Sequence, residues 1–305
     1  MKPSQGLFKP IEGAKMKHKD KDENSRKKEK EEQEEEGLEE QFWEEEVFAE
    51  EEVEDEEVDE ASLKYLVRLL DEKNDKERAN AVEAIADYAN EGLTEKSALP
   101  KLVKLLEDKY EDARMNAALA LSNYANNGLV DESALPKLVK LLDDEEEVAV
   151  FAVTALAAYA SKGLTDKSAL PKLVELLDDE EMGMFTLTAL AAYASKGLTD
   201  KSALPKLVKL LENEDQGIRI YTLQTLSTYA SEKLTDKSAL PKIVEQLDDG
   251  FVCAHAAETL GKYASQGLTE KSALPKLKEL LKDEDTQEKA QYALDRYAEK
   301  GLKPA

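Results

Sequence analysis

The chain has 305 residues, of which 42 are Lys or Arg and 67 are Asp or Glu, so its formal net charge is −25. A chain this acidic repels phosphate backbones, which argues against direct nucleic-acid binding. One cysteine excludes a disulfide framework, and two histidines exclude a multi-histidine metal centre. The first residues lack the apolar core of a signal peptide, and no apolar run approaches the ~18 residues of a membrane span. We therefore expect a cytoplasmic protein that makes no membrane contact.

The charge is distributed unevenly along the chain. Residues 1–30 contain ten basic and five acidic residues, whereas residues 31–60 contain nineteen acidic residues and no basic one. Neither part has a sustained apolar face, so neither can bury enough surface to offset the entropy lost on folding. We predict that residues 1–60 form a largely disordered tail that is basic over 1–30 and acidic over 31–60.

An apolar segment interrupts the acidic run at residues 41–53. Its large apolar side chains are Phe42, Trp43, Val47 and Phe48. Trp43 and Val47 are four residues apart and would share one face of a short helix, and the surrounding glutamates favour a helix. Two interpretations stay open. The segment is either a solvated acidic run with stray aromatics or a docking motif that binds in cis or mediates self-association through the tail.

From residue 61 the sequence repeats itself. The string Ser-Ala-Leu-Pro-Lys recurs around prolines that are 34 to 36 residues apart, namely Pro100, Pro136, Pro171, Pro205, Pro241 and Pro275. A Tyr-Ala pair recurs seven times, led by Tyr88, Tyr124, Tyr159, Tyr193, Tyr229, Tyr263 and Tyr297. Such a period is typical of stacked supersecondary units that bury their apolar faces against one another. Residues 61–305 are therefore predicted to form one array rather than two globular domains.

Each unit is predicted to be a pair of helices. In the second unit, Ser97 is a candidate N-cap and Pro100 falls in the first helical turn, where a missing N–H costs nothing. The second helix is expected from about Asp112 to Asn126, with Gly128 as its stop. No segment shows the alternation of a strand, so the predicted class is all-α.

The units resemble HEAT-like repeats of the short type found in phycobilisome-lyase-like proteins. The matching residues of the second unit are Ala98, Leu99, Pro100, Leu105, Leu106, Arg114, Ala117, Ala118, Ala120 and Leu121. The resemblance implies a right-handed α-solenoid of seven two-helix repeats, with the second helices along the concave surface. The arginine typical of the family's second helix is present as Arg78, Arg114 and Arg219, and it is replaced by Ala149, Gly183, Cys253 and Gln287. A continuous Asp–Arg ladder is therefore not expected, and the fold by itself does not specify a function.

The positions that vary between repeats predict a binding surface. At about 100° per residue, positions −9, −8, −5 and −1 relative to the repeated tyrosine project away from the core. They are acidic at the start of the array, apolar in the middle and mixed with basic residues at the end. The predicted partner-binding groove of repeats 2–5 contains Met115, Leu119, Val150, Phe151, Met184, Phe185, Ile220, Tyr221 and His255. The alternative is that position −8 packs against the neighbouring second helix.

The predicted function is that of a non-enzymatic scaffold or adaptor. Its groove would hold a helix or an extended apolar segment of a partner protein, and its acidic tail would steer or compete with that partner. The alternative is an acidic chaperone or assembly factor for a basic protein, such as a ribosomal or nucleic-acid-binding protein.

Enzymatic functions fit the sequence poorly, and no cofactor is expected. A HEAT-repeat dimetal hydroxylase would need several His-Glu pairs, and neither His18 nor His255 is followed by Glu. A HEAT-like DNA glycosylase would need a basic concave face. Tetrapyrrole handling like that of a bilin lyase stays open, because an aromatic groove could hold such a ligand. We interpret Cys253 as a packing residue and His255 as a polar residue beside the groove, with a ligand or pH-sensitive role as its alternative.

Overall fold

The structure is a computed structural model that describes residues 55–179 and 181–302. Within these residues the chain forms fourteen α-helices, four short 3₁₀ helices and no strand, which confirms the all-α class. The predicted tail lies outside the described residues except for residues 55–60, which belong to helix α2 (Asp55–Leu69). Also outside them is the predicted docking motif, Phe42, Trp43, Val47 and Phe48.

The fourteen helices form seven consecutive pairs, as the seven tyrosines predict. The first helices of the pairs are α2, α4 (Leu99–Leu105), α6 (Leu135–Leu141), α8 (Ala169–Glu175), α10 (Ala203–Leu210), α12 (Ala239–Glu245) and α14 (Ala273–Leu280). The second helices are α3 (Asp75–Asn90), α5 (Glu111–Asn126), α7 (Glu146–Ser161), α9 (Gly183–Ala194), α11 (Gln216–Ser231), α13 (Cys253–Ser265) and α15 (Glu284–Glu299).

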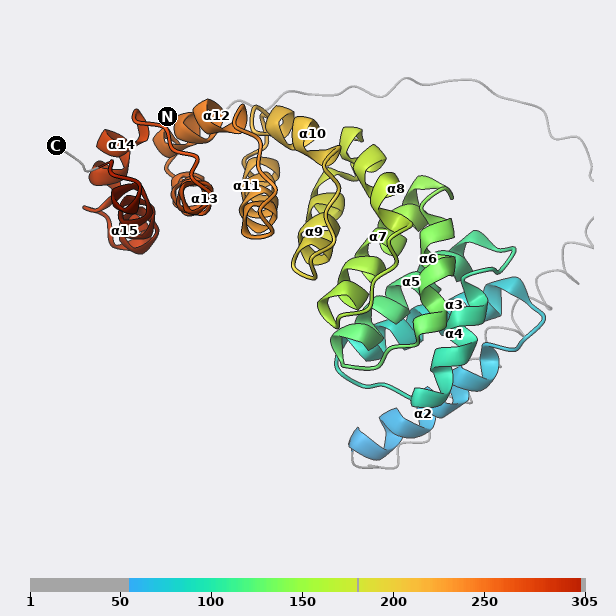
Figure 1. Cartoon of the computed structure of the whole chain (residues 1–305). Helices are drawn as coiled ribbons and strands as arrows, with labels where there is room; N and C mark the ends of the chain where they lie inside the picture. The colour runs from blue at the N-terminus through green and yellow to red at the C-terminus, as the bar shows by residue number, and fades with distance from the viewer. Residues whose placement is uncertain (1–54, 180, 303–305) are drawn as a thin grey trace, which may run out of the picture. The chain divides into compact units, whose positions relative to one another are not determined.

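The pairs stack into two rows of helices. Each second helix packs against the second helix of the next repeat, from α3 on α5 through to α13 on α15. Figure 1 shows α9, α11, α13 and α15 side by side in one row, with the first helices α10, α12 and α14 in a second row beside it. Leucine, alanine and tyrosine side chains form one core that continues through all seven repeats. Each repeat is therefore stabilised mainly by its neighbours.

The second helices of repeats 4 and 6 are shorter than the others. Helices α9 and α13 have 12 and 13 residues, whereas α7 and α11 each have 16. In both short repeats the first helix continues into a 3₁₀ turn, η3 (Leu176–Asp178) or η4 (Gln246–Asp248). In these repeats the prolines are 34 residues apart, one or two fewer than in the others, and the second helix is shorter by about one turn.

The predicted N-cap at Ser97 is wrong. Helix α4 begins at Leu99, after the 3₁₀ turn η1 (Lys96–Ala98), and the carboxylate of Glu95 accepts a hydrogen bond from the Ser97 N–H at 3.0 Å. Asp131 and Ser133 repeat this contact at 3.0 Å. In both cases the acidic residue two positions before the serine accepts the hydrogen bond from the serine N–H. The serine therefore lies inside the 3₁₀ turn and does not cap it.

The predicted stop of the second helix is confirmed. Gly128 has a φ of +85°, and the N–H of Leu129 donates to the carbonyl of Tyr124 at 2.9 Å. This left-handed conformation ends the helix at little cost only in glycine, which lacks a Cβ. In the fifth repeat Lys233 takes the same conformation with a φ of 64°, the single non-glycine residue of the described chain to do so.

The repeated tyrosines are core residues, with one exception. Tyr124, Tyr159 and the four that follow are fully buried, and the hydroxyl of Tyr124 accepts a hydrogen bond from the Glu95 N–H at 3.1 Å. Burial raises the pKa of Tyr159 to about 12. Tyr88 is only partly buried, because the segment that corresponds to the Glu95 loop belongs to helix α2 in the first repeat.

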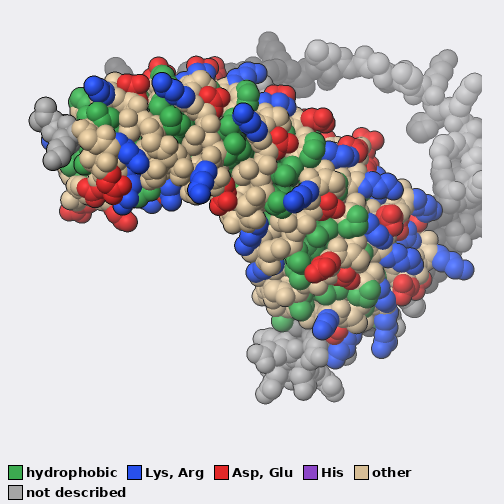
Figure 2. All heavy atoms as spheres, viewed as in Figure 1, with side chains coloured by type: hydrophobic (Ala, Val, Ile, Leu, Met, Phe, Trp, Pro, Cys, Tyr) green, Lys and Arg blue, Asp and Glu red, His purple; other side chains and the backbone are tan. Residues whose placement is uncertain are grey.

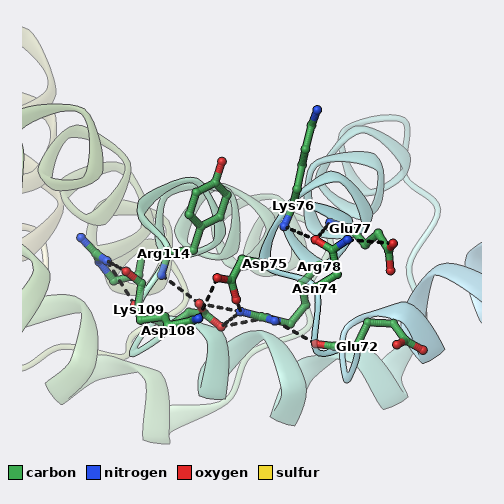
Figure 3. Close-up of polar contacts among 10 residues, drawn as sticks. Glu72, Asn74, Asp75, Lys76, Glu77, Arg78, Asp108, Lys109 and Arg114 are labelled. Carbon is green, nitrogen blue, oxygen red and sulfur yellow. Dashed lines mark hydrogen bonds and ion pairs between the residues drawn. The ribbon is translucent and has the colours of Figure 1, made fainter. Parts of the chain in front are cut away.

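Arginine–aspartate pairs connect three of the six repeat junctions. The guanidinium of Arg78 donates to the Asp108 carboxylate at 2.9 and 2.8 Å and also reaches Asp75 at 3.0 Å (Figure 3). Arg114 pairs with Asp144 at 2.6 Å, and Arg219 with Asp249 at 2.6 Å. The other junctions have Ala149, Gly183 and Cys253 at the arginine position. The ladder is discontinuous, as the sequence predicts.

A lysine contact recurs between successive first helices. The Lys101 Nζ donates to the carbonyl of Val67 at 2.7 Å and lies 2.7 Å from the Asp71 carboxylate. Equivalent contacts to a carbonyl of the preceding first helix are made by Lys137, Lys206, Lys242 and Lys276. The lysine–carbonyl link is present at two of the three junctions that lack the arginine, and at the third, between repeats 3 and 4, Lys172 instead pairs with the Asp143 carboxylate.

Candidate protein-binding groove

The predicted groove residues all lie on second helices of consecutive repeats. Met115 and Leu119 are on α5, and His255 is on α13. The remaining residues are Val150 and Phe151 on α7, Met184 and Phe185 on α9, and Ile220 and Tyr221 on α11. Met184 is 41% exposed, and the other eight residues are half-buried. The structure therefore places an apolar side chain with free surface on each of four neighbouring helices.

The half-buried aromatics divide their surface between core and solvent. Phe151, Phe185 and Tyr221, all at position −8, pack against the core and remain partly exposed. Packing within the stack and partial exposure to solvent are thus both present at this position. The expectation that all four variable positions point outward is wrong for Ala79, Asn116 and Ala158, which are buried. The two alanines are short enough to lie beneath their neighbours.

Threonine hydroxyls line the groove without offering free donors. Thr154 donates to the carbonyl of Val150 at 2.9 Å, and Thr188 donates to the carbonyl of Met184 at 2.9 Å. Because each hydroxyl is satisfied by its own helix, these side chains present mainly their methyl groups to a ligand. The variable positions of repeats 3–5 contain no charged residue. This part of the surface therefore favours an apolar ligand over a charged one.

The sequence reasoning missed Phe251, which is the most exposed large apolar residue of the described chain. Phe251 is 78% exposed and lies in the turn before α13, where its N–H donates to the Asp249 carboxylate at 3.0 Å. It stands at position −12 relative to Tyr263, two residues before α13 begins, so the helical periodicity used to compare the repeats does not reach it.

His255 lies in a small polar pocket at the end of the apolar row. The pocket has a volume of about 270 Å³ and is lined by Gln224, Ser227, Thr228, His255, Glu258 and Thr259. Burial lowers the pKa of His255, so the imidazole is neutral at neutral pH. The Glu258 carboxylate lies 2.7 Å from the Lys289 Nζ. The pocket therefore presents neutral hydrogen-bonding groups and one neutralised carboxylate.

Cys253 is the first residue of α13, the helix that also carries His255, and it is buried. Its thiol donates a long hydrogen bond of 3.5 Å to the carbonyl of Gly250, and burial raises its pKa. A protonated, buried thiol is a poor nucleophile and metal ligand. Among the residues that the structure describes, no group of three or more His, Cys, Asp or Glu side chains is arranged to hold a metal ion.

An acidic edge borders the apolar row in repeats 2–4. We define it by five exposed carboxylates near the beginnings of the second helices: Asp112, Glu146, Glu147, Asp179 and Glu181. A hydrogen bond with Glu181 and the negative charge of that residue raise the pKa of the Glu146 carboxyl. Elsewhere the two signs of charge are interspersed, and Figure 2 shows acidic, basic and hydrophobic side chains mixed over the visible face. None of the described helices combines the length and apolar character needed to cross a membrane.

Comparisons with known proteins agree with this architecture. A family model of HEAT repeats matches residues 63–157, 135–227 and 204–295. A designed armadillo repeat protein is 28% identical with a TM-score of 0.51, and the match covers 77% of this chain and 99% of that one. A second designed armadillo repeat protein, solved in complex with the peptide (KR)4, gives the same values. An engineered protein is 25% identical with a TM-score of 0.58, covering 78% of this chain and 68% of that one.

A search of curated proteins finds no match. The three segments matched by the family model together extend from residue 63 to residue 295, which is well over half of the chain. The seven stacked helix pairs of the structure cover the same part of the sequence. The chain belongs to the HEAT repeat family.

Proposed function

We propose that the chain is a non-enzymatic adaptor that binds an apolar segment of a partner protein on the second helices of repeats 2–5. One observation carries the proposal: apolar side chains with free surface occupy equivalent positions on α5, α7, α9 and α11. HEAT and armadillo-like solenoids are typical of interaction scaffolds. An apolar row of this length on a chain this acidic is more consistent with a binding site than with an ordinary surface.

The dimensions of the row fit a short helix or strand. Neighbouring helices pack about 8–10 Å apart, so four of them span about 30 Å, the length of a ~20-residue helix. Full burial of an apolar side chain contributes ~1.5–3 kcal/mol, and the side chains of the row are already half-buried, so each gains only part of that amount when a segment binds. The cost of association is about 4–15 kcal/mol. The partner's own apolar side chains must therefore supply much of the binding free energy.

One similar structure supports a peptide as the ligand. A designed armadillo repeat protein was solved with the basic peptide (KR)4 bound to it. The groove of this chain differs because its variable positions in repeats 3–5 are uncharged. We infer that apolar contacts, rather than a series of ion pairs, supply most of the affinity here.

The test is a comparison of binding partners between the intact protein and a groove variant. Met184→Asp with Phe151→Ala places a charge in the row and removes an aromatic surface. We expect recovery of the partner from lysate, quantified by mass spectrometry, to fall at least tenfold, as for a central interface residue. Tyr65→Asp is the matched control, because Tyr65 is 59% exposed on α2, outside the groove.

Circular dichroism must first show that both variants fold like the intact chain. If the same partners return with both variants, the groove is not the binding site. A second candidate function, an acidic chaperone for a basic protein, is favoured by the net charge of −25. It makes a different prediction: binding is lost in 0.5 M salt and survives the groove variant, since screening removes long-range attraction.

A further inference from the structure

We propose that the segment bound in the groove is amphipathic and cationic, with apolar side chains on the row and Lys or Arg side chains against the acidic edge. This inference rests on the proposed function, because it specifies the partner of the same groove. Three observations support it. The carboxylates lie near the apolar row, they lack the arginine that pairs with equivalent carboxylates elsewhere, and the chain's own apolar segment is acidic.

Carboxylates of the acidic edge lie close to the apolar row along the chain. Glu147 precedes Val150 by three residues and Phe151 by four, and this spacing places side chains next to each other on one face of α7. Glu181 has the same spacing to Met184 and Phe185 and lies in the turn two residues before α9 begins. A segment that lies on the row therefore runs beside these carboxylates over repeats 3 and 4.

The acidic edge lacks the arginine that neutralises other junctions. Asp144 and Asp249 each bind an arginine of the preceding repeat. Asp179 is the equivalent residue at the junction of repeats 3 and 4, but Ala149 stands at the arginine position there. Within the described part of the chain, no ion pair joins a Lys or Arg to any of the five carboxylates of the edge.

The carboxylates at this junction also repel one another. Glu146 and Glu181 lie within hydrogen-bonding reach, and the charges of Asp179 and Glu147 add to the repulsion that raises the pKa of Glu146. A cationic side chain placed among them would relieve this repulsion and form charge-assisted hydrogen bonds. The surface is therefore complementary to a ligand with Lys or Arg on one side of its apolar face.

The charge argues against the chain's own apolar segment as the occupant. Residues 41–53 carry six acidic residues and no basic one, so the acidic edge would repel them. The same carboxylates would attract a cationic partner. Occupation by the tail is thus a distinct outcome that the following experiment detects.

The experiment uses two synthetic amphipathic 18-residue peptides as probes. Both have leucines at the same helical positions, and the flanking positions are Lys in one peptide and Glu in the other. Fluorescence anisotropy with the full chain is expected to show at least tenfold tighter binding of the Lys peptide at low salt. The edge variant Glu146→Gln/Glu181→Gln should weaken that binding three- to tenfold.

The matched control is Glu132→Gln/Glu175→Gln, which changes the net charge equally at two exposed glutamates on the first-helix side of repeats 3 and 4. It should leave the dissociation constant within twofold. If it weakens binding as much as the edge variant does, net charge rather than the edge attracts the peptide, and the inference is overturned.

The remaining outcomes separate this inference from the proposed function. If neither peptide binds, or if Met184→Asp/Phe151→Ala leaves binding unchanged, the groove itself fails as a binding site. If both peptides bind equally and the groove variant abolishes both, the groove stands and the cationic partner is wrong. If removal of residues 1–54 strengthens binding of the Glu peptide to the affinity of the Lys peptide, the tail occupies the groove and the inference is overturned.

Discussion

The junction of repeats 2 and 3 and the junction of repeats 3 and 4 both stack one second helix on the next, but they have opposite electrostatics. At the first, Arg114 binds Asp144 at 2.6 Å. At the second, Ala149 replaces the arginine, and Asp179 lies among other carboxylates. The hydrophobic core continues through both junctions without a break. Apolar packing therefore holds the helices together, and the polar residues set the charge of the surface beside the groove.

The largest expected effect comes from removing the arginine of the first junction. Arg114→Ala should lower the free energy of unfolding by about 2 kcal/mol, because Asp144 stays partly buried and loses two charge-assisted hydrogen bonds. Urea denaturation followed by circular dichroism measures the loss. Arg114→Lys should lose an intermediate amount, since an ammonium cannot reproduce the two-pronged contact. An unchanged midpoint in Arg114→Ala would show that the pair contributes nothing.

A smaller gain is expected from adding the arginine to the second junction. Asp179 already accepts hydrogen bonds from the N–H groups of Glu181 and Met182 at 2.9 and 3.1 Å, so its carboxylate is held in place. Ala149→Arg should therefore raise the free energy of unfolding by about 1 kcal/mol. It should also weaken binding of the cationic probe peptide, because the new guanidinium neutralises the edge. Ala149→Gln controls for side-chain length, and equal midpoints for the two variants would contradict the ionic explanation.

The smallest effect is a difference in pH dependence between the junctions. The hydrogen bond from Arg114 lowers the pKa of Asp144, so its stabilisation is present above the unfolded value of 3.8 and is lost as the pH falls through the lowered folded pKa. The hydrogen bond with Glu181 raises the pKa of Glu146 above 4.5, so the folded state gains stability as the pH falls through that raised pKa. Glu181→Gln should therefore raise the urea midpoint more at pH 7 than at pH 4.5. Equal shifts at both values would show that the two carboxyls do not interact.

Much of the fold could be predicted because the sequence repeats. The expected second helix from about Asp112 to Asn126 is within one residue of α5, since the repeated tyrosine and Gly128 determine its face and its end. The cap at Ser97 was wrong because Glu95 accepts a hydrogen bond from the Ser97 N–H and so starts a 3₁₀ turn before the serine. The expected boundary after residue 60 differs from the structure, in which α2 begins at Asp55.

The candidate site was less predictable than the fold. The variable positions identified the row of Phe151, Phe185 and Tyr221, because periodicity determines which side of a helix a residue occupies. Periodicity does not determine how deeply a side chain is buried, so Asn116 and Ala158 were assigned to the surface although they are buried. The approach of Glu146 to Glu181 depends on how two repeats of different length pack together. The sequence of either repeat alone therefore does not predict how close these two carboxylates lie.

The buried tyrosines have a consequence for spectroscopy. Burial raises the pKa of Tyr159, Tyr193 and Tyr229 to about 12, whereas an unfolded chain ionises its tyrosines near the ordinary value of about 10. At about pH 11 these phenols therefore stay protonated while the helices are stacked and become phenolates when the stack opens. Phenolate absorbs ultraviolet light at longer wavelengths than phenol. The absorbance of the protein in alkali thus records the opening of the stacked repeats without an added dye.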